Sequence, residues 1–137
     1  AKVLHDARCP VLTAAHSERR SRLRLPQRIL CAVDGSPKSL PLISWARDFA
    51  CAVGATLRLL HVVGPVSDWL ALESERRLQG EVQEIARVKI DKMLRSNGIA
   101  APLDVAVGQV AATVAEDAQY TDADLVIIDR GHIVEQL

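Results

Sequence analysis

The sequence contains few aromatic residues and no excess charge of either sign. Aromatics make up 3% of the 137 residues, and 17 basic side chains balance 17 acidic ones. Stacking platforms for single-stranded nucleic acid need more aromatics, and a neutral chain has no long-range attraction to nucleic acid or anionic membrane. No apolar run approaches the roughly 18 residues of a membrane span, and no charged-then-apolar leader opens the chain. We therefore expect one globular domain with its own core, located in the cytoplasm.

Cysteines and catalytic motifs are equally scarce. Cys9, Cys31 and Cys51 are odd in number and far apart, so they fit neither a metal site nor a disulfide framework, and buried, reduced thiols are expected. The G-x-S-x-G, H-E-x-x-H, Walker A and G-x-G-x-x-G motifs are missing. Asp129 and His132 lie three residues apart, but two ligands do not make a metal site. We predict a protein that is not an enzyme, with no catalytic residue and no bound metal.

The chain is organised around residues 28–36, which read RILCAVDGS. The apolar run 29–33 stops abruptly at Asp34, and a helical pattern begins shortly after. This is typical of a strand buried on both faces that feeds a helix through a tight loop. Ligands of open α/β sheets bind at such loops. Asp34 is therefore a candidate ligand-binding residue, although an aspartate before Gly-Ser also suits a loop or helix cap.

Strand and helix patterns alternate along the rest of the chain. The periodicity predicts helices over 39–53, 69–96 and 109–121, and strands over 29–33, 56–63, 103–107 and 124–129. Such alternation favours an α/β, doubly wound parallel sheet with helices on both faces. The apolar strands 29–33 and 125–128 should be central and the half-polar strand 103–107 outermost, which gives the order 3-2-1-4. The outer side of the fourth strand is then bare unless a fifth strand covers it.

The long predicted helix 69–96 and the histidine of the strand 56–63 each allow more than one interpretation. The predicted helix 69–96 is capped by Ser67 or Asp68, and Gly80 weakens it, so its first third is either a separate short helix or a mobile lid. One apolar stripe runs along it, formed by Leu78, Val82, Ile85, Ala86, Ile90, Met93 and Leu94. His61 lies between apolar neighbours in a strand, which favours a packed or partly exposed side chain over a catalytic base.

Several runs resemble the universal stress protein family. They are ILCAVDGSPKSLPLISWARDFACAVGATLRLLHVV, similar to that family's opening strand, helix and strand, and GQVAATVAEDAQYTDADLVII, similar to its third helix and fourth strand. The resemblance implies a doubly wound domain with a fifth strand beside the fourth, often used for dimerisation. In nucleotide-binding members it implies contacts to adenine and ribose from Ala32, Val33, Asp34 and Val62, with Ile128 and Asp129 at the start of a phosphate loop.

The phosphate loop of that family, of form G-x-x-G, nine residues, then G and Ser or Thr, is altered in this chain. Asp129 and His132 stand where the first two glycines are expected, and the later glycine and serine do not occur before Leu137. A phosphate cradle needs backbone N–H groups that glycine lets turn inward, and a carboxylate repels a polyanion, an effect that Arg130 offsets in part. We therefore expect a stress-response domain that acts by association or dimerisation and in which ATP binding is weak or lost, so that no cofactor is required. The alternative is an ATP-binding regulatory domain whose loop is completed outside this chain.

The first residues resemble the other end of the same family's domain. Residues 1–15, AKVLHDARCPVLTAA, are similar to its last helix turn and fifth strand, and the arginine-rich stretch 16–27 reads as a solvated linker before the domain 28–137. A tandem protein explains this order more simply than a rearranged or incomplete chain. Residues 9–13 would then supply the fifth strand, within the chain or to another copy, as a homodimer or tandem-domain contact through the sheet edge.

Overall fold

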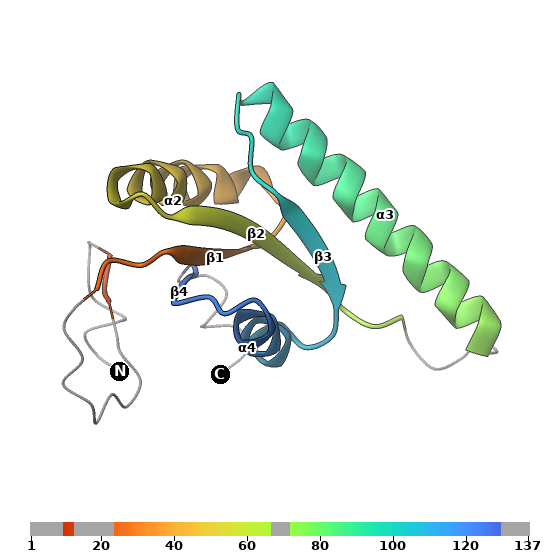
Figure 1. Cartoon of the computed structure of the whole chain (residues 1–137). Helices are drawn as coiled ribbons and strands as arrows, with labels where there is room; N and C mark the ends of the chain where they lie inside the picture. Colours follow the sequence, from red (N-terminus) through yellow and green to blue (C-terminus); the bar gives the residue numbers. More distant parts are fainter. Residues whose placement is uncertain (1–9, 13–23, 67–71, 130–137) are drawn as a thin grey trace.

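The fold is a parallel sheet with helices on both faces (Figure 1). In this computed structural model the described residues are 10–12, 24–66 and 72–129. The elements are β1 (Arg28–Val33), η1 (Pro37–Ser39), α2 (Leu40–Val53), β2 (Thr56–Val63), α3 (Leu72–Ser96), β3 (Leu103–Val107), α4 (Val110–Tyr120) and β4 (Leu125–Ile127). The strand order is β3-β2-β1-β4 and every pair is parallel. The predicted fold class and order are confirmed.

The two faces of the sheet bury unequal cores. Helices α2 and α3 cover one face, and α4 covers the other (Figure 1). The larger core lies under α2 and α3, while the core under α4 is small and its buried members are Leu30, Ala32, Leu60 and Val114. All residues of β1 after Arg28 are buried, as expected for a strand with helices on both sides.

Helix α2 ends at Val53, as its sequence predicts, and begins at Leu40, one residue after the predicted start. Ser36 caps η1, the turn of helix before α2, by accepting a hydrogen bond from the Lys38 backbone N–H at 3.3 Å, and Gly54 ends α2 in the left-handed conformation with φ 72°. Ala46 and Ala50 are buried, so the helix lies close to the sheet. Cys51, on the same helix, is exposed. The expectation of a buried thiol was therefore right for Cys31 and wrong for Cys51, because the short helix turns that position to solvent; Cys9 lies outside the described residues.

Helix α3 buries only part of its predicted apolar stripe. The helix is continuous through Gly80, so the expected break is absent, while Ser67, Asp68 and the predicted start at 69 lie outside the described residues. Its 25 residues span about 37 Å, whereas the five residues of β3 span about 16 Å. The helix therefore overhangs the sheet (Figure 1). Ile90 and Leu94 are buried, but Ile85 is 67% exposed.

Strand β4 is shorter than predicted and lies at the edge of the described sheet. It pairs with β1 over Leu125–Ile127, whereas strand character was expected over 124–129. Residues 10–12 do not form a strand, and the rest of the proposed fifth strand, 9–13, is outside the described part of the chain. The predicted central position of the fourth strand depends on that fifth strand, and no described strand fills its outer side.

A carboxylate joins the beginnings of β1 and β4. Asp124 accepts hydrogen bonds from the backbone N–H groups of Gln27 and Arg28 at 2.9–3.1 Å, and its own N–H donates to the Arg28 carbonyl at 2.9 Å. Partial burial pushes the pKa of Asp124 upward, but these N–H donors and the Arg28 charge outweigh it, so the pKa is lowered. The last strand is thus fixed to the first by a residue just outside the strand.

Candidate functional site

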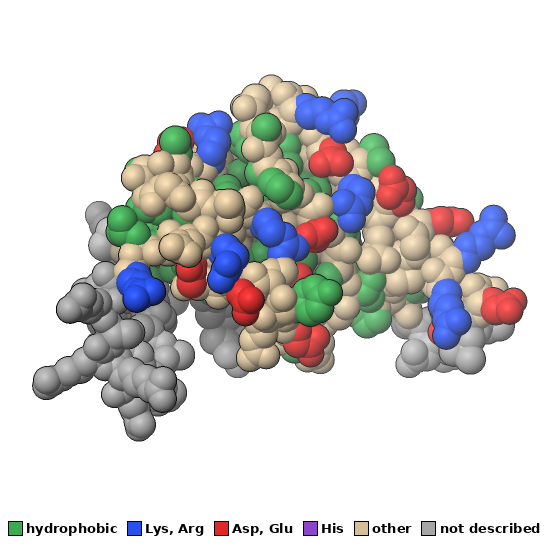
Figure 2. Space-filling view, in the orientation of Figure 1, with side chains coloured by type: hydrophobic (Ala, Val, Ile, Leu, Met, Phe, Trp, Pro, Cys, Tyr) green, Lys and Arg blue, Asp and Glu red, His purple; other side chains and the backbone are tan. Residues whose placement is uncertain are grey.

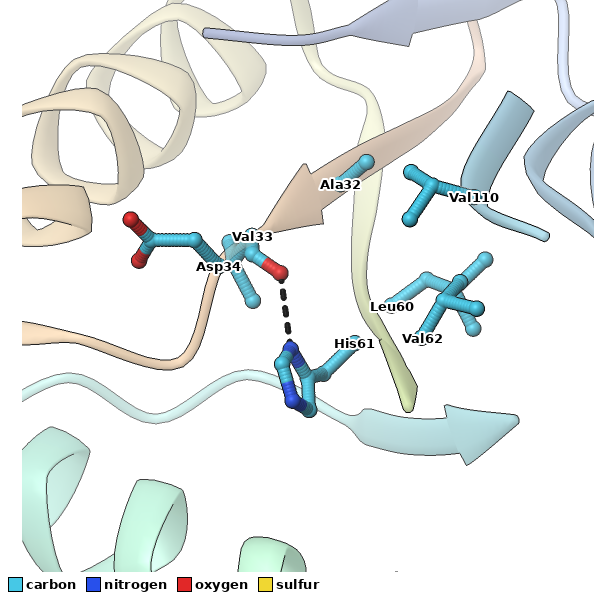
Figure 3. A pocket seen from close by; sticks show the side chains of 7 residues that line it. All are labelled: Ala32, Val33, Asp34, Leu60, His61, Val62 and Val110. Atoms are coloured by element: carbon cyan, nitrogen blue, oxygen red, sulfur yellow. Dashed lines mark hydrogen bonds between the residues drawn. The ribbon is translucent and has the colours of Figure 1, made fainter. Parts of the chain in front are cut away.

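A hollow of about 120 Å³ opens at the carboxyl ends of β1 and β2 (Figure 3). Its lining residues are Ala32, Val33, Asp34, Leu60, His61, Val62 and Val110. Four of the six predicted binding residues, Ala32, Val33, Asp34 and Val62, therefore come together. They meet because the ends of adjacent parallel strands lie at the same edge of the sheet.

The other two predicted residues do not line this hollow. Ile128 is 44% exposed and Asp129 is exposed, both just beyond the end of β4. Arg130 and His132 lie outside the described residues. Any part that Ile128 and Asp129 play in binding a nucleotide stays a prediction.

The Asp34 carboxylate is engaged in the loop after β1. Its Oδ1 accepts from the Ser36 backbone N–H at 2.8 Å, from the Ser36 hydroxyl at 2.8 Å and from the Ser39 hydroxyl at 2.5 Å. The Asp34 N–H in turn donates to Ser39 Oγ at 3.2 Å. Figure 3 shows the carboxylate directed away from Leu60 and Val110. Of the two roles considered for Asp34, loop cap and ligand contact, the first is observed.

The His61 ring supports the turn that follows Asp34. Its Nδ1 lies 2.9 Å from the Val33 carbonyl oxygen (Figure 3). Because a carbonyl oxygen only accepts, Nδ1 carries the proton. Gly35 has φ 77°, and a Cβ there would lie 3.0 Å from His61 Cε1 and 3.2 Å from Ile90 Cδ1. The partly buried ring is therefore packed against this turn, and only glycine fits over it.

No reactive pair is found among the described residues of the site. Burial raises the pKa of the Cys31 thiol to about 12, so this cysteine stays protonated and poorly nucleophilic. No group of three His, Cys, Asp or Glu side chains that could hold a metal ion occurs within residues 10–12, 24–66 and 72–129. The walls from Leu60, Val62 and Val110 are apolar, which suits a flat or apolar group better than a phosphate.

A cluster of charges lies on the α4 face of the sheet, nearer the start of β2, and was not anticipated. Arg58 forms an ion pair with Asp104 of β3, and its Nη1 lies 3.6 Å from Asp117 Oδ2 of α4. The Asp117 oxygen is buried without a hydrogen bond, so the attraction of Arg58 is what compensates its charge. Arg58, a charged residue inside the apolar run of β2, was the sequence feature that could have indicated this cluster. Its partners could not be predicted, because they come from two other segments, β3 and α4.

A second unanticipated set of contacts joins α3 to the outer edge of β3. Gln83 Nε2 donates to the Val105 carbonyl at 3.0 Å, and Arg87 Nη1 donates to the Leu103 carbonyl at 2.8 Å. The neighbouring Pro102 carbonyl accepts from β2, at Leu59 N–H, which shows that the alternate carbonyls face outward. This edge is thus covered by side chains, four residues apart, on one face of a helix.

These features define the class of protein: a doubly wound α/β domain with a crevice at the carboxyl ends of its inner strands. The chain matches the model of the universal stress protein family over residues 26–132. It belongs to that family. No curated protein matches the sequence closely enough to add a more specific relative.

Solved structures of the family share the fold. A universal stress protein of Burkholderia pseudomallei is 20% identical with a TM-score of 0.52, covering 81% of this chain and 86% of its own. The hypothetical protein MJ0577 is 22% identical with a TM-score of 0.60, covering 75% and 74%. UspA of Lactobacillus plantarum is 18% identical with a TM-score of 0.59, covering 77% of each chain. At these identities the likeness concerns the fold alone.

The helices give no indication of a membrane span. None of those in the described ranges combines the length and apolar character needed to cross a bilayer.

Proposed function

We propose that this chain is a non-enzymatic stress-response domain, cytoplasmic as its composition predicts, that acts by association through the β4 edge and binds ATP weakly or not at all. The observation that carries the proposal is the state of that edge. No strand within the described residues pairs with the outer side of β4, and Val126 in β4 and Ile128 just after it are 38% and 44% exposed. An open edge with apolar neighbours is a template for another strand.

The dimensions and charge of the crevice support weak nucleotide binding. Its volume is about 120 Å³, below the roughly 300–1,000 Å³ of typical small-molecule sites. Asp34, for which the family resemblance implies a contact to ribose, is engaged by Ser36 and Ser39. Asp129 adds a carboxylate beyond β4 where the family pattern has glycine. The small volume and the engaged Asp34 disfavour any nucleoside, and the Asp129 carboxylate disfavours a triphosphate more than a neutral group.

The test of association is a pair of lysines at the β4 edge. V126K/I128K places charge at two exposed positions and should leave the fold intact, because edge lysines prevent strand addition without disturbing the core. We expect sedimentation velocity to show a smaller species than the unmodified chain at the same concentration. A matched control is Y120K on α4, where Tyr120 is 91% exposed. Equal sedimentation of all three proteins would refute association through this edge.

A second candidate, an ATP-binding regulatory domain, is favoured by one specific observation. Ala32, Val33, Asp34 and Val62 lie at one hollow, and its apolar walls suit adenine. Comparing ATP with adenosine by calorimetric titration separates the two functions. A lost phosphate site predicts equal affinities for the two ligands, or no binding of either. ATP binding at least about tenfold tighter than adenosine, equivalent to roughly 1.4 kcal/mol, would establish the second candidate instead.

A further inference from the structure

Helix α3 carries a second apolar stripe on the side turned away from the sheet. The inner side packs Ile90 and Leu94 into the core, but Leu78, Ile85 and Val88 are 36%, 67% and 57% exposed. At 100° per residue, Ile85 and Val88 lie about 140° and 160° around the helix from Ile90. A helix that only covers a sheet needs one apolar face. The outer stripe therefore calls for a partner.

The charges of α3 are divided between its two halves. The first half, residues 72–84, has four glutamates against two arginines, and the second half, residues 85–96, has four basic residues against one aspartate. Figure 2 shows side chains of both signs at the overhanging end of the helix. A second helix with the opposite distribution would complement the first. An antiparallel copy of α3 has that distribution.

We propose that α3 docks against α3 of a second copy of this chain, antiparallel, through the outer stripe. With Ile85 facing Val88 of the second copy, the next layer on each side places Glu81 opposite Lys92. The layer beyond it sets Leu78 against the long side chain of Arg95, whose methylene groups can cover it. The contact is isologous, since each layer occurs twice about the two-fold axis.

The residues of the proposed contact are available for it. Glu81, Lys92 and Arg95 are exposed. Glu81 lies 3.4 Å from Arg77 of its own helix, but both side chains are more than half exposed, and exposed pairs of this kind are weak and readily exchanged. The contact is separate from the β4 edge, which is at the other end of the sheet. A chain with both contacts would form assemblies larger than a dimer.

Charge reversal on α3 tests the proposal, in the V126K/I128K background so that the β4 edge does not contribute. E81K and K92E each create two like-charged pairs, and we expect either one to weaken self-association at least about tenfold in sedimentation equilibrium at low salt. Mixing the two variants, or combining both changes in one chain, restores opposite charges and should restore association. E116K on α4, an exposed glutamate, makes the same charge change and should have no effect.

The outcomes separate this proposal from the one for the β4 edge. If V126K/I128K changes nothing while E81K lowers the association state, the α3 contact stands and the β4 contact fails. A V126K/I128K chain that is monomeric at every concentration, or a mixture of E81K and K92E that associates no better than its components, would overturn the α3 contact. Binding of the monomer to phosphatidylcholine vesicles is the other outcome that would overturn the α3 contact. If I85D abolishes that binding and Y120D does not, the stripe contacts a membrane surface instead of a second copy.

Discussion

The two edge strands of the described sheet, β3 and β4, differ in whether other residues cover their outer sides. At the β3 edge, Gln83 and Arg87 of α3 donate to the outward carbonyls of Val105 and Leu103. At the β4 edge, no described strand covers the outer side, and Val126 in β4 and Ile128 just after it are exposed. A sheet edge with satisfied carbonyls does not recruit a strand, whereas an open apolar edge does. If the chain associates through its strands, as proposed, we therefore expect the β4 edge and not the β3 edge to form the contact.

Removing the cover from the β3 edge should have the largest effect. Q83A/R87A deletes two part-buried hydrogen bonds to edge carbonyls, and we expect a loss of about 2–3 kcal/mol in the free energy of unfolding. Urea denaturation measures it, with E84A/K89A on exposed positions of the same helix as the control. The uncovered edge should also promote aggregation. A loss no greater than in the control would show that α3 packs on β3 without protecting it.

Releasing the start of β4 comes next. D124A removes the acceptor of the Gln27 and Arg28 N–H groups, and a cost of about 1 kcal/mol is expected, as for an exposed capping aspartate. Hydrogen exchange should locate the change at β1 and β4, with β3 unaffected. D48A on α2 serves as the control for loss of an exposed charge. Faster exchange in β3 as well would mean that the two edges are not independent.

The lowered pKa of the Asp124 carboxylate predicts that the stability contributed by its contacts at the start of β4 depends on pH. The pKa of Asp124 is lowered in the folded state, so its contribution is complete above the unfolded pKa of about 3.9 and is lost as pH falls through the folded value. We expect the difference in unfolding free energy between the unmodified chain and D124N to shrink below about pH 4. Thermal unfolding from pH 6 to pH 2.5 measures this difference. A gap that stays constant over that range would contradict the assigned cause.

The smallest expected effect is a gain in stability of α3, the helix that covers the β3 edge. Gly80 lies inside α3, and a Cβ there would meet nothing within 4 Å. G80A should stabilise the helix by about 0.5–1 kcal/mol, because alanine restricts the unfolded chain and favours helix. The rise in thermal midpoint should accompany slower exchange of the β3 amides. An unchanged midpoint would mean that the first half of α3 frays independently of the edge it helps to cover.

Much of the fold was predictable because its elements are local. The boundaries 56–63 and 103–107 were confirmed without change, since an apolar run and a strict alternation are read within one segment. Ile85 was placed in the same apolar stripe of α3 as Ile90 and Leu94, but it is exposed. Periodicity identifies the apolar positions of a helix, but it does not show how much of the helix the neighbouring strand covers. Strand β4 was predicted too long at both ends: the Asp124 side chain caps the start of β1 before β4 begins, and the pairing with β1 ends at Ile127.

The candidate site was predicted in part. Ala32, Val33, Asp34 and Val62 come together because parallel strands end at one edge. Leu60 and Val110 were missed as lining residues, since a strand interior and a helix start carry no sign of the cavity between them. The sequence allowed two roles for Asp34, a loop cap and a ligand contact. The hydrogen bonds from Ser36 and Ser39 in the structure show the loop cap.

The sequence by itself determined the order and type of the elements, the parallel sheet and the family, because these follow from patterns within single segments and their succession. The tertiary structure decided which side of α3 is buried, which edge of the sheet is closed and where the ion pairs of Arg58 form. Those features depend on relative lengths and on contacts between residues far apart in the chain. Such contacts exist only once the segments have packed together.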